Sequence, residues 1–562
     1  MQGGYFDIKP FGATPSGRQL NHMKIGKKAF IHFGINTFCN KEWGDGTENI
    51  ELFAPSSLNV RGWIRDLKEA GFEFVILTAK HHDGFCLWPS KYTEHSIKNT
   101  PYKNGEGDIV REFTDACREF NVKAGIYVSP WDRNSKYWGT DEYSRQYAGQ
   151  IEEIVTQYGR IDEIWWDGAG SHETKYDWGL WAYIIRTHQP EAVIFGSIGA
   201  TPYAEMRWVG NEAGFAGKTH YASIDEKAML AEDRNALNRG RIGGNRYVPA
   251  EVDVSIRPGW FYHEDQNDKV KSSRRIDEIW FRSVGNNAIM LLNFPPDRTG
   301  NLVRTDLDNA IESHKRISSM LSTNFVLGAC VHADSEYCEE SEIFKACLDD
   351  DNLFYATAAD CDSAVIDITL SADTPSFNTL ILGEKVELGE RILSFKLECL
   401  DTGEAQTLYE GTSVGYLRAV TFERGEYKKM RLTLHGIEAP LTLRTLSLTS
   451  YDEDTSSEAM ELKRFNLAAL GTAQTIIADD GKSAQILFGG IYPFDTVCFN
   501  VYWPGGEYTV YAFDGSKYYA IASGTALEHF VRVKLDSPVV GSYQVKIEYT
   551  KPLSQEPDFK IM

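Results

Sequence analysis

Eight short runs rich in β-branched and aromatic residues, each followed by a stretch of helical periodicity, occupy the chain from about residue 30 to 322. This alternation is typical of βα units arranged around a parallel sheet. The expected strands cover residues 29–34, 72–79, 122–129, 161–168, 192–197, 205–212, 248–256 and 288–295. Eight such units predict a closed (β/α)8 barrel, as in triosephosphate isomerase-like folds.

The segments between these runs have apolar residues at helical spacing, most clearly within residues 109–120 and 143–158. A longer helical pattern over residues 302–323 is expected to complete the barrel. The 562 residues exceed what one hydrophobic core supports, since single cores stop growing at about 250–300 residues. Further domains must therefore follow the barrel.

Beyond the barrel the pattern changes to short alternating runs separated by turn residues, which is typical of antiparallel β-sandwiches. One set of runs fills residues 326–450, and a second set fills residues 460–550. The polar segment 451–458 between them is expected to be a linker. We therefore predict a catalytic barrel over 1–325, a first β-sandwich over 326–450 and a second over 455–562.

Charge and cysteine usage exclude several classes of function. The formal net charge of −22 repels phosphate backbones and anionic lipids, so we expect no nucleic-acid partner. No stretch approaches 18 uninterrupted apolar residues, so no membrane insertion is expected. Nine cysteines without a C-x-x-C pair indicate neither a zinc site nor a disulfide framework.

Polar residues gather where the expected strands end. Lys80-His81-His82-Asp83, Trp131-Asp132, Asp167 and Asn211-Glu212 each follow a strand directly. Active sites of such barrels lie at the carboxyl ends of the strands and in the loops after them. We therefore expect these side chains to share one rim.

Asp167 and Glu212 are the two acids best placed for chemistry. Hydrolysis of a glycosidic bond with retention requires one carboxylate that attacks the anomeric carbon and a second carboxyl that protonates the leaving oxygen. Each acid could equally cap a helix or pair with an arginine at the rim. The barrel pattern alone does not decide between these alternatives.

The His81-His82-Asp83 run suggests a metal site, because imidazole and carboxylate are common ligands. Adjacent residues on an extended segment point in opposite directions, so both rings should not reach one ion. We therefore expect no metal there and favour hydrogen bonds to substrate hydroxyls. His32 on the first strand is equally consistent with a core histidine and with a ligand-binding one.

Seven motifs occur in order over the barrel. They read IHFGINTF (31–38), Glu42-Trp43, WIRDLKEAGFEFVILTAKHHDGFCLWPS (63–90), YVSPWDRN (127–134), EIWWDG (163–168), RWVGNEAG (207–214) and EVDVSIRPGWFYH (251–263). Together they resemble glycoside hydrolase family 29, the α-L-fucosidases, and the AKHHDGF run is the most diagnostic piece. The resemblance covers effectively the whole barrel.

The resemblance implies that Asp167 is the nucleophile and Glu212 the acid/base of an enzyme without a cofactor. Glu251 is the second candidate for the acid. The fucose-binding positions that it implies are His32, Glu42, Trp43, His81, His82, Trp131, Trp165 and Arg207, with Arg257 and Trp260 at the pocket mouth.

GNEAG together with SIRPGWFYH resembles the branch of the family that prefers α1,3- and α1,4-linked fucose of Lewis-type glycans. The substrate implied is a fucosylated oligosaccharide or glycoconjugate, and the expected address is periplasmic or secreted, with any signal peptide already absent. The 326–450 sandwich resembles galactose-binding-like modules, which either bind carbohydrate or buttress the barrel. The rival functions are an inactive fucose- or glycan-binding protein and a metal-dependent hydrolase that uses His81 and His82.

Overall fold

The computed structural model describes residues 8–171, 174–196, 199–348, 350–452, 474–478, 480–487, 494–501, 503–513, 517–527, 529–539, 544–551, 553 and 559–561. The chain divides into two compact units. The first comprises Met1–Asn324, Val331–Ile368 and Pro375–Tyr451, and the second comprises Phe325–Cys330, Thr369–Thr374 and Asp452–Met562. Most of the expected linker at 451–458 lies outside the described residues, and the domain limits expected from the sequence stay a prediction.

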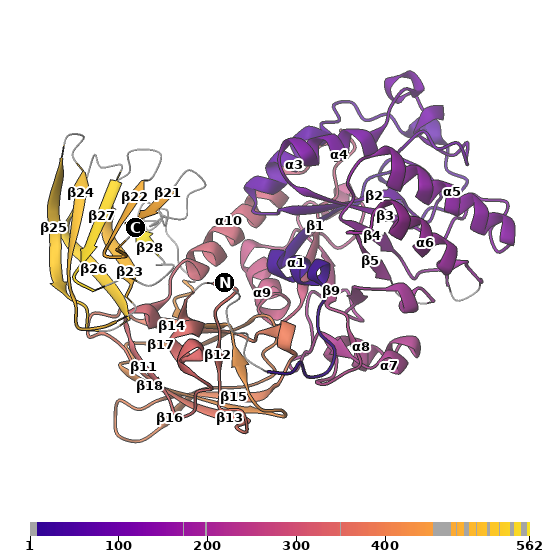
Figure 1. Cartoon of the computed structure of the whole chain (residues 1–562). Coiled ribbons are helices and arrows are strands. Elements are labelled where there is room, and N and C mark those ends of the chain that lie inside the picture. The colour runs from indigo at the N-terminus through magenta and orange to yellow at the C-terminus, as the bar shows by residue number, and fades with distance from the viewer. Residues whose placement is uncertain are drawn as a thin grey trace. The chain divides into compact units, whose positions relative to one another are not determined.

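The first unit contains the eight expected strands, all parallel, in one sheet of order β5-β4-β3-β2-β1-β10-β9-β6. Their bounds are β1 Lys27–Ile31, β2 Phe74–Lys80, β3 Lys123–Val128, β4 Glu163–Trp166, β5 Val193–Gly196, β6 Arg207–Trp208, β9 Ala250–Ser255 and β10 Ile289–Asn293. The two ends of the sheet meet where Phe195 bridges Met206 in parallel and the Gly196 amide donates to the Met206 carbonyl at 3.3 Å. The predicted (β/α)8 barrel is therefore confirmed, in nearly closed form (Figure 1).

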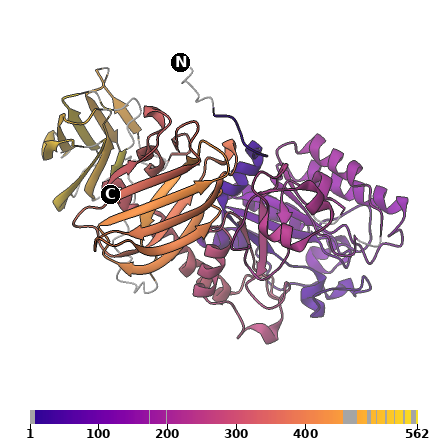
Figure 2. The ribbon, with the colours of Figure 1, turned by 90° about the horizontal axis from the view of Figure 1, so that it is seen from below.

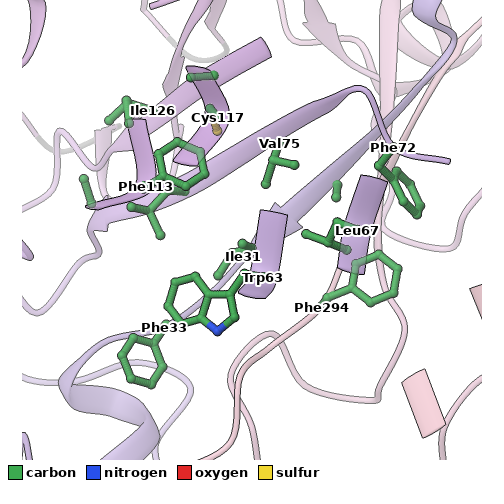
Figure 3. Packing of buried hydrophobic residues seen from close by; sticks show 14 of the residues in the cluster. Ile31, Phe33, Trp63, Leu67, Phe72, Val75, Phe113, Cys117, Ile126 and Phe294 are labelled. Carbon is green, nitrogen blue, oxygen red and sulfur yellow. The ribbon is translucent and has the colours of Figure 1, made fainter. Parts of the chain in front are cut away.

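Helices cover the outside of the barrel (Figure 1). They are α3 Val60–Glu69, α4 Ile109–Glu119, α5 Asp141–Gln157, α6 Trp178–His188, α9 Ser273–Arg282 and α10 Arg304–Leu321. Helix α1 Gly17–Ile25 instead packs His22 and Met23 against the interior of the barrel, and α2 Ile35–Cys39 lies after β1 at the rim. In α4 the Asp108 side chain caps the first turn by accepting from the Arg111 amide at 2.9 Å, and Ile109, Phe113 and Cys117 face inward as their spacing predicts. Figure 3 shows Phe113 and Cys117 packed beside Val75 and Ile126 of the sheet.

The barrel strands alternate between two cores. In β1, Ala29 and Ile31 pack toward the helices, whereas Phe30 belongs to a separate interior cluster that includes Tyr127, Trp165 and Phe195. This alternation follows from the period of two along a strand, which sends successive side chains to opposite faces. The interior cluster forms the floor below the rim where the polar residues were expected.

A long excursion leaves the barrel between β6 and β9. It spans residues 209–249 and contains β7 Ser223–Ile224, α7 Glu226–Leu230, α8 Arg234–Arg239 and β8 Arg246–Tyr247. Strands β7 and β8 pair with each other in antiparallel fashion. We call this segment the β6–β9 excursion.

The remainder of the first unit is the first β-sandwich, whose broad antiparallel sheet is seen in Figure 2. One sheet has the order β11-β13-β18-β15-β16, a second has the order β17-β14-β20, and β12 pairs with β19. The strands are β11 Cys330–Ala333, β12 Tyr355–Ala356, β13 Ser363–Thr369, β14 Phe377–Gly383, β15 Ile392–Cys399, β16 Gln406–Thr412, β17 Arg418–Gly425, β18 Lys429–Gly436, β19 Thr442–Leu443 and β20 Thr445–Thr449.

The second unit is also built from antiparallel sheets, in the orders β21-β22-β27-β24-β25 and β26-β23-β28. Its strands are β21 Gln474–Ile477, β22 Ser483–Leu487, β23 Phe494–Asn500, β24 Glu507–Phe513, β25 Tyr518–Thr525, β26 Phe530–Val539, β27 Gln544–Tyr549 and β28 Phe559–Ile561. All nine cysteines lie among the described residues, and each is a free thiol. None of the described helices has both the length and the apolar character needed to cross a bilayer.

Candidate active site

A cavity opens at the carboxyl ends of the barrel strands, where the sequence predicts the site. Among the residues expected there, the cavity is lined by His32, Trp43, His81, His82, Trp165, Asp167, Arg207, Glu212 and Trp260. Four expected residues are not part of its lining, namely Glu42, Trp131, Glu251 and Arg257. Most of the expected set is thus brought together at one rim.

Asp167 directly follows β4 and keeps 27% of its side chain exposed to the cavity. The Tyr127 hydroxyl donates to its Oδ2 atom at 2.9 Å, and the Ala169 amide donates to its Oδ1 atom at 2.9 Å. His82 Nε2 lies 3.7 Å from Oδ2. Donors on both oxygens fix the orientation of the carboxylate.

Glu212 lies in the turn at the start of the β6–β9 excursion, where its side chain lines the cavity and is exposed to solvent. The neighbouring protein atoms remove part of the hydration of its carboxyl group and so raise its pKa, and the nearby charge of Asp167 adds to that rise. The Trp260 indole donates to Oε2 at 3.3 Å and opposes the rise in pKa. The cavity therefore holds two carboxyl groups in unlike surroundings, of which Glu212 keeps its proton to higher pH than an ordinary glutamate.

The three histidines of the cavity are held as neutral rings. Burial lowers the pKa of His32 to about 3 and also lowers the pKa of His81 and of His82. His32 Nδ1 lies 2.8 Å from Asn293 Oδ1, and His82 Nδ1 lies 2.8 Å from Ser129 Oγ. Neutral imidazoles can both donate to and accept from hydroxyl groups.

The expectation that His81 and His82 point in opposite directions is wrong. Their ring centroids are 4.1 Å apart, and both rings line the cavity. The reason is that β2 ends at Lys80 and the chain turns at once, with the Gly84 amide donating to the His81 carbonyl at 3.0 Å. The period of two that holds in an extended strand does not apply in a turn.

Asp83, the third member of the possible metal triad, is committed elsewhere. Its carboxylate accepts from Asn36 Nδ2 at 3.0 Å and from the Phe85 amide at 2.7 Å. Among the described residues, the group with metal-ligand spacing is instead His22, Glu163 and Glu251, deep in the barrel. Lys28 donates to both of these carboxylates, at 2.6 Å to Glu163, so an ammonium group already supplies the cation there.

Glu251 belongs to that buried cluster and not to the rim. Besides the bond from Lys28, its Oε2 atom accepts from the Trp165 indole at 3.0 Å. Trp165 in turn stacks on Phe195 with ring centroids 3.8 Å apart and an interplanar angle of 5°. Glu251 therefore holds the aromatic floor of the cavity from below.

Glu42 and Trp131 lie behind cavity residues. The Glu42 carboxylate accepts from the backbone amides of Trp260 at 2.8 Å and Phe261 at 3.2 Å, and it lies 2.5 Å from His263 Nε2. The Trp131 ring lies 5.1 Å from the His82 ring, centroid to centroid. Glu42 thus anchors the loop that carries Trp260, and Trp131 packs against His82.

Both expected arginines have structural partners. Arg207 reaches the cavity wall, yet its guanidinium donates to backbone carbonyls of Tyr221 at 2.8 Å, Ala222 at 2.9 Å and Leu237 at 3.0 Å, and also to that of Val248. Arg257 is buried and pairs with both oxygens of Asp306 at 2.7 and 2.9 Å. These partners lie far along the chain, so the local motifs gave no sign of them.

The structure adds cavity residues that the sequence analysis missed, among them Phe30, Tyr127, Phe195, Trp208, Met229, Glu232, Arg234, Leu237 and Asp253. Asp253 is a third carboxyl of the cavity and, unlike Asp167 and Glu212, is buried; its Oδ1 atom accepts from the Trp208 indole at 3.0 Å. Burial and then the charge of Glu212 raise its pKa well above the ordinary value. The available signal was the polar alternation of Glu251, Asp253 and Ser255 within a buried strand.

This arrangement suits a neutral, polyhydroxylated ligand with one apolar face. Neutral imidazoles and carboxyl groups can bind hydroxyls, and the flat floor formed by Trp165 can pack against carbon. An anionic carboxylate and a carboxyl of raised pKa in one cavity are the two groups that acid-assisted cleavage of an acetal requires.

Comparison with known proteins agrees with this chemistry. The family profile described as α-L-fucosidase matches residues 19–313. α-L-Fucosidase 1 of Arabidopsis thaliana is 38% identical over 424 residues, which cover 74% of this chain and 82% of the relative.

Two solved structures are similar as well. A Bacteroides thetaiotaomicron protein provisionally described as an α-L-fucosidase is 40% identical with a TM-score of 0.76, covering 80% of this chain and all of that one. A Ruminococcus gnavus family 29 fucosidase in complex with fucose is 29% identical with a TM-score of 0.73, covering 80% of this chain and 98% of that one. From the fold, the cavity and these relationships together, the chain belongs to glycoside hydrolase family 29, the α-L-fucosidases.

Proposed function

We propose that this α-L-fucosidase family member is a retaining exo-enzyme that removes terminal α-L-fucose through a covalent fucosyl-enzyme. The observation that carries the proposal is the pair of unlike carboxyl groups in the cavity. Two donors orient the Asp167 carboxylate, whereas partial loss of hydration in the cavity raises the pKa of Glu212. Retaining hydrolysis requires one carboxyl in each of these states.

In the first step, an Asp167 oxygen attacks the anomeric carbon while Glu212 gives its proton to the departing glycosidic oxygen. The bond to the aglycone breaks as the ester to Asp167 forms. In the second step, Glu212 removes a proton from water, whose oxygen displaces Asp167 from the anomeric carbon. Two inversions leave the configuration unchanged, and both carboxyl groups return to their starting states.

The other cavity residues would bind the sugar. His32, His81 and His82 are neutral and can exchange hydrogen bonds with ring hydroxyls. The floor of Trp165 stacked on Phe195 offers an apolar surface for the ring face and the C6 methyl group. One methyl in an apolar niche contributes only about 1–3 kcal/mol of discrimination, so hydroxyl contacts must supply much of the specificity.

For the substrate, we propose α1,3- and α1,4-linked fucose of Lewis-type glycans, on the strength of the GNEAG and SIRPGWFYH motifs. The similar structure from Ruminococcus gnavus, which is in complex with fucose, supports fucose as the sugar that is bound. We further propose that the catalytic barrel, the first sandwich and the second sandwich correspond to residues 1–325, 326–450 and 455–562.

The test is release of free L-fucose from a Lewis-type trisaccharide and from an α1,2-linked fucosyllactose by the wild type, D167A and E212A. We expect release from the first substrate only, lost in both variants. Turnover of the α1,2 substrate alone would overturn the linkage assignment. Failure of the wild type on every fucosylated glycan, with retained binding of fucose, would instead make the protein a glycan-binding one.

Azide separates the roles of the two acids on an aryl fucoside. In D167A, azide should take the place of the nucleophile and give the β-fucosyl azide, with inverted configuration. In E212A, azide should intercept the fucosyl-enzyme and give the α-fucosyl azide, with retained configuration. The opposite pair of products would exchange the two assignments.

A further inference from the structure

The β6–β9 excursion forms one wall of the cavity. It supplies Glu212, Met229, Glu232, Arg234 and Leu237 to the lining. Its regular elements are short, the longest being the six residues of α8. Such a segment has little internal structure to hold it, so its placement must depend on contacts with its surroundings.

From the barrel side, Arg207 holds the excursion. Its guanidinium donates to the carbonyls of Tyr221, Ala222, Leu237 and Val248. The fork geometry of arginine fixes these carbonyls relative to one another. The base of the excursion, near residues 221–222, is thereby joined to Leu237 in the cavity wall.

From the opposite side, the same backbone is held by Glu390 of the first sandwich. This side chain is 1% exposed, and both of its oxygens are used. Oε1 accepts from the Ala222 amide at 2.9 Å and from Asn287 Nδ2 at 2.7 Å. Oε2 accepts from the Ser223 amide at 2.9 Å and from the Ser223 hydroxyl at 2.5 Å.

Ala222 therefore lies between two buried groups of opposite charge. Its amide donates to Glu390 and its carbonyl accepts from Arg207. Burial lowers the pKa of Arg207, and the charge of Glu390 counteracts this lowering across the peptide. Two further sandwich contacts lie alongside, from the His220 amide to Ser413 Oγ at 3.0 Å and between the Thr219 and Thr412 hydroxyls at 2.7 Å.

We propose that Glu390 is a positioning residue for the cavity wall that carries Glu212, so that the first sandwich is a working part of the active site. The inference rests on the acid/base role proposed for Glu212. Glu390 acts through Ala222 and Ser223, and through them on Arg207 and the cavity-lining residues of the excursion. It does not contact the substrate.

A carboxylate is the group that this position requires. Four N–H and O–H donors converge on the two oxygens, and only an ionised carboxylate accepts on both sides. A glutamine at 390 would turn its own N–H donors toward either the Ala222 amide or the Ser223 amide. The hydrogen bond from one of these two amides would then be lost, while the volume of the side chain stays nearly the same.

Asp401 provides a matched control within the same sandwich. Its carboxylate also accepts from two successive backbone amides, those of Lys428 at 3.0 Å and Lys429 at 2.6 Å. Both partners belong to the sandwich. Asp401 is exposed, so Asp401→Asn removes the same type of amide contact at the surface of the sandwich without touching the excursion.

The experiment compares wild type, E390Q and D401N by hydrogen–deuterium exchange and by kinetics on one fucoside. In E390Q we expect faster exchange in peptides from 209–241, a kcat reduced about tenfold and a displaced alkaline limb of the pH profile. In D401N we expect these quantities to match the wild type. Equal exchange over 209–241 in E390Q, with kcat and pH profile unchanged, would overturn the proposal even if the melting temperature fell.

A second variant covers the case in which E390Q does not fold. T412V/S413A removes only the two flanking sandwich contacts, to Thr219 and His220. It should give smaller increases in exchange over 209–241 and a smaller loss of kcat than E390Q. Unchanged exchange and kinetics would count against the proposal. Absence of any fucosidase activity in the wild type would refute the proposed function. The exchange data would still decide the positioning role, since they do not depend on turnover.

Discussion

Replacement of Trp260 by phenylalanine tests how the protonation of Glu212 is set. The Trp260 indole donates to Glu212 Oε2, which lowers the pKa of that carboxyl against the larger effect of lost hydration. Phenylalanine keeps an aromatic ring and removes the donor. The pKa of Glu212 should therefore rise, and its acid form should persist to higher pH.

The magnitude follows from the geometry of this contact. A hydrogen bond to a charged group contributes about 1.5–3 kcal/mol. At 3.3 Å the indole contact is long and open to solvent, so about 0.7 kcal/mol, or half of the lower bound, is a reasonable value. Since 1.36 kcal/mol corresponds to a tenfold change, the alkaline limb of kcat/KM should move upward by about half a pH unit.

The assay is the pH dependence of kcat/KM on one fucoside, because this profile reports the groups of the free enzyme. Trp208→Phe is the matched control, since its indole donates to Asp253 and not to Glu212. We expect its alkaline limb to coincide with that of the wild type, although its activity can fall. An unmoved or downward-shifted limb in Trp260→Phe would refute the assignment of that limb to Glu212.

Three further predictions concern the acid, a buried ion pair and metal ions. Glu212→Gln should lower kcat about 10²–10⁴-fold on an unactivated glycan. Glu251→Gln should leave the alkaline limb of the pH profile in place and keep most of kcat. A larger loss of kcat in Glu251→Gln than in Glu212→Gln would make Glu251 the acid. Arg257→Met leaves Asp306 buried without its partner and should lower the free energy of unfolding, measured in urea, by about 3–5 kcal/mol; a changed KM with normal stability would place Arg257 at the pocket mouth after all. Exhaustive treatment with EDTA should leave kcat/KM unchanged, and recovery by an added divalent ion would revive a metal role for His81–Asp83.

The barrel could be predicted because its information is local. Strands β2 and β3 are short runs of mostly apolar residues. In the helix between them, Ile109, Phe113 and Cys117 recur at helical spacing. Asp167 could be placed at the rim for the same reason, since it ends a strand. Its donor Tyr127 was not singled out, although it too lies near the end of a strand.

The roles of the arginines could not be predicted, because their partners are remote. Arg257 pairs with Asp306, which is 49 residues away, and Arg207 binds carbonyls that any sequence would offer. Every residue has a backbone carbonyl, so a hydrogen bond to one cannot be recognised from the sequence of side chains. The same limit hid the link from Glu390 to Ala222, which lie 168 residues apart.

The possible directions of His81 and His82 illustrate a different limit. The rule of alternation holds for an extended strand. The expected strand already ends at residue 79, but the sequence does not show that the chain turns directly after Lys80 instead of continuing extended. Element boundaries decide where side chains point at a strand end. Site geometry is therefore least predictable at the rim, where function resides.

The proposed mechanism requires a covalent bond between Asp167 and fucose. Incubation with 2-deoxy-2-fluoro-L-fucosyl fluoride should displace fluoride and leave a slowly hydrolysed ester, because the 2-fluoro group destabilises both oxocarbenium-like transition states. Peptide mass spectrometry should then find one fluorofucosyl adduct per chain, on the peptide containing Asp167, and none in D167A. An adduct on Glu212 or Glu251, or turnover with inverted configuration and no adduct, would contradict the account.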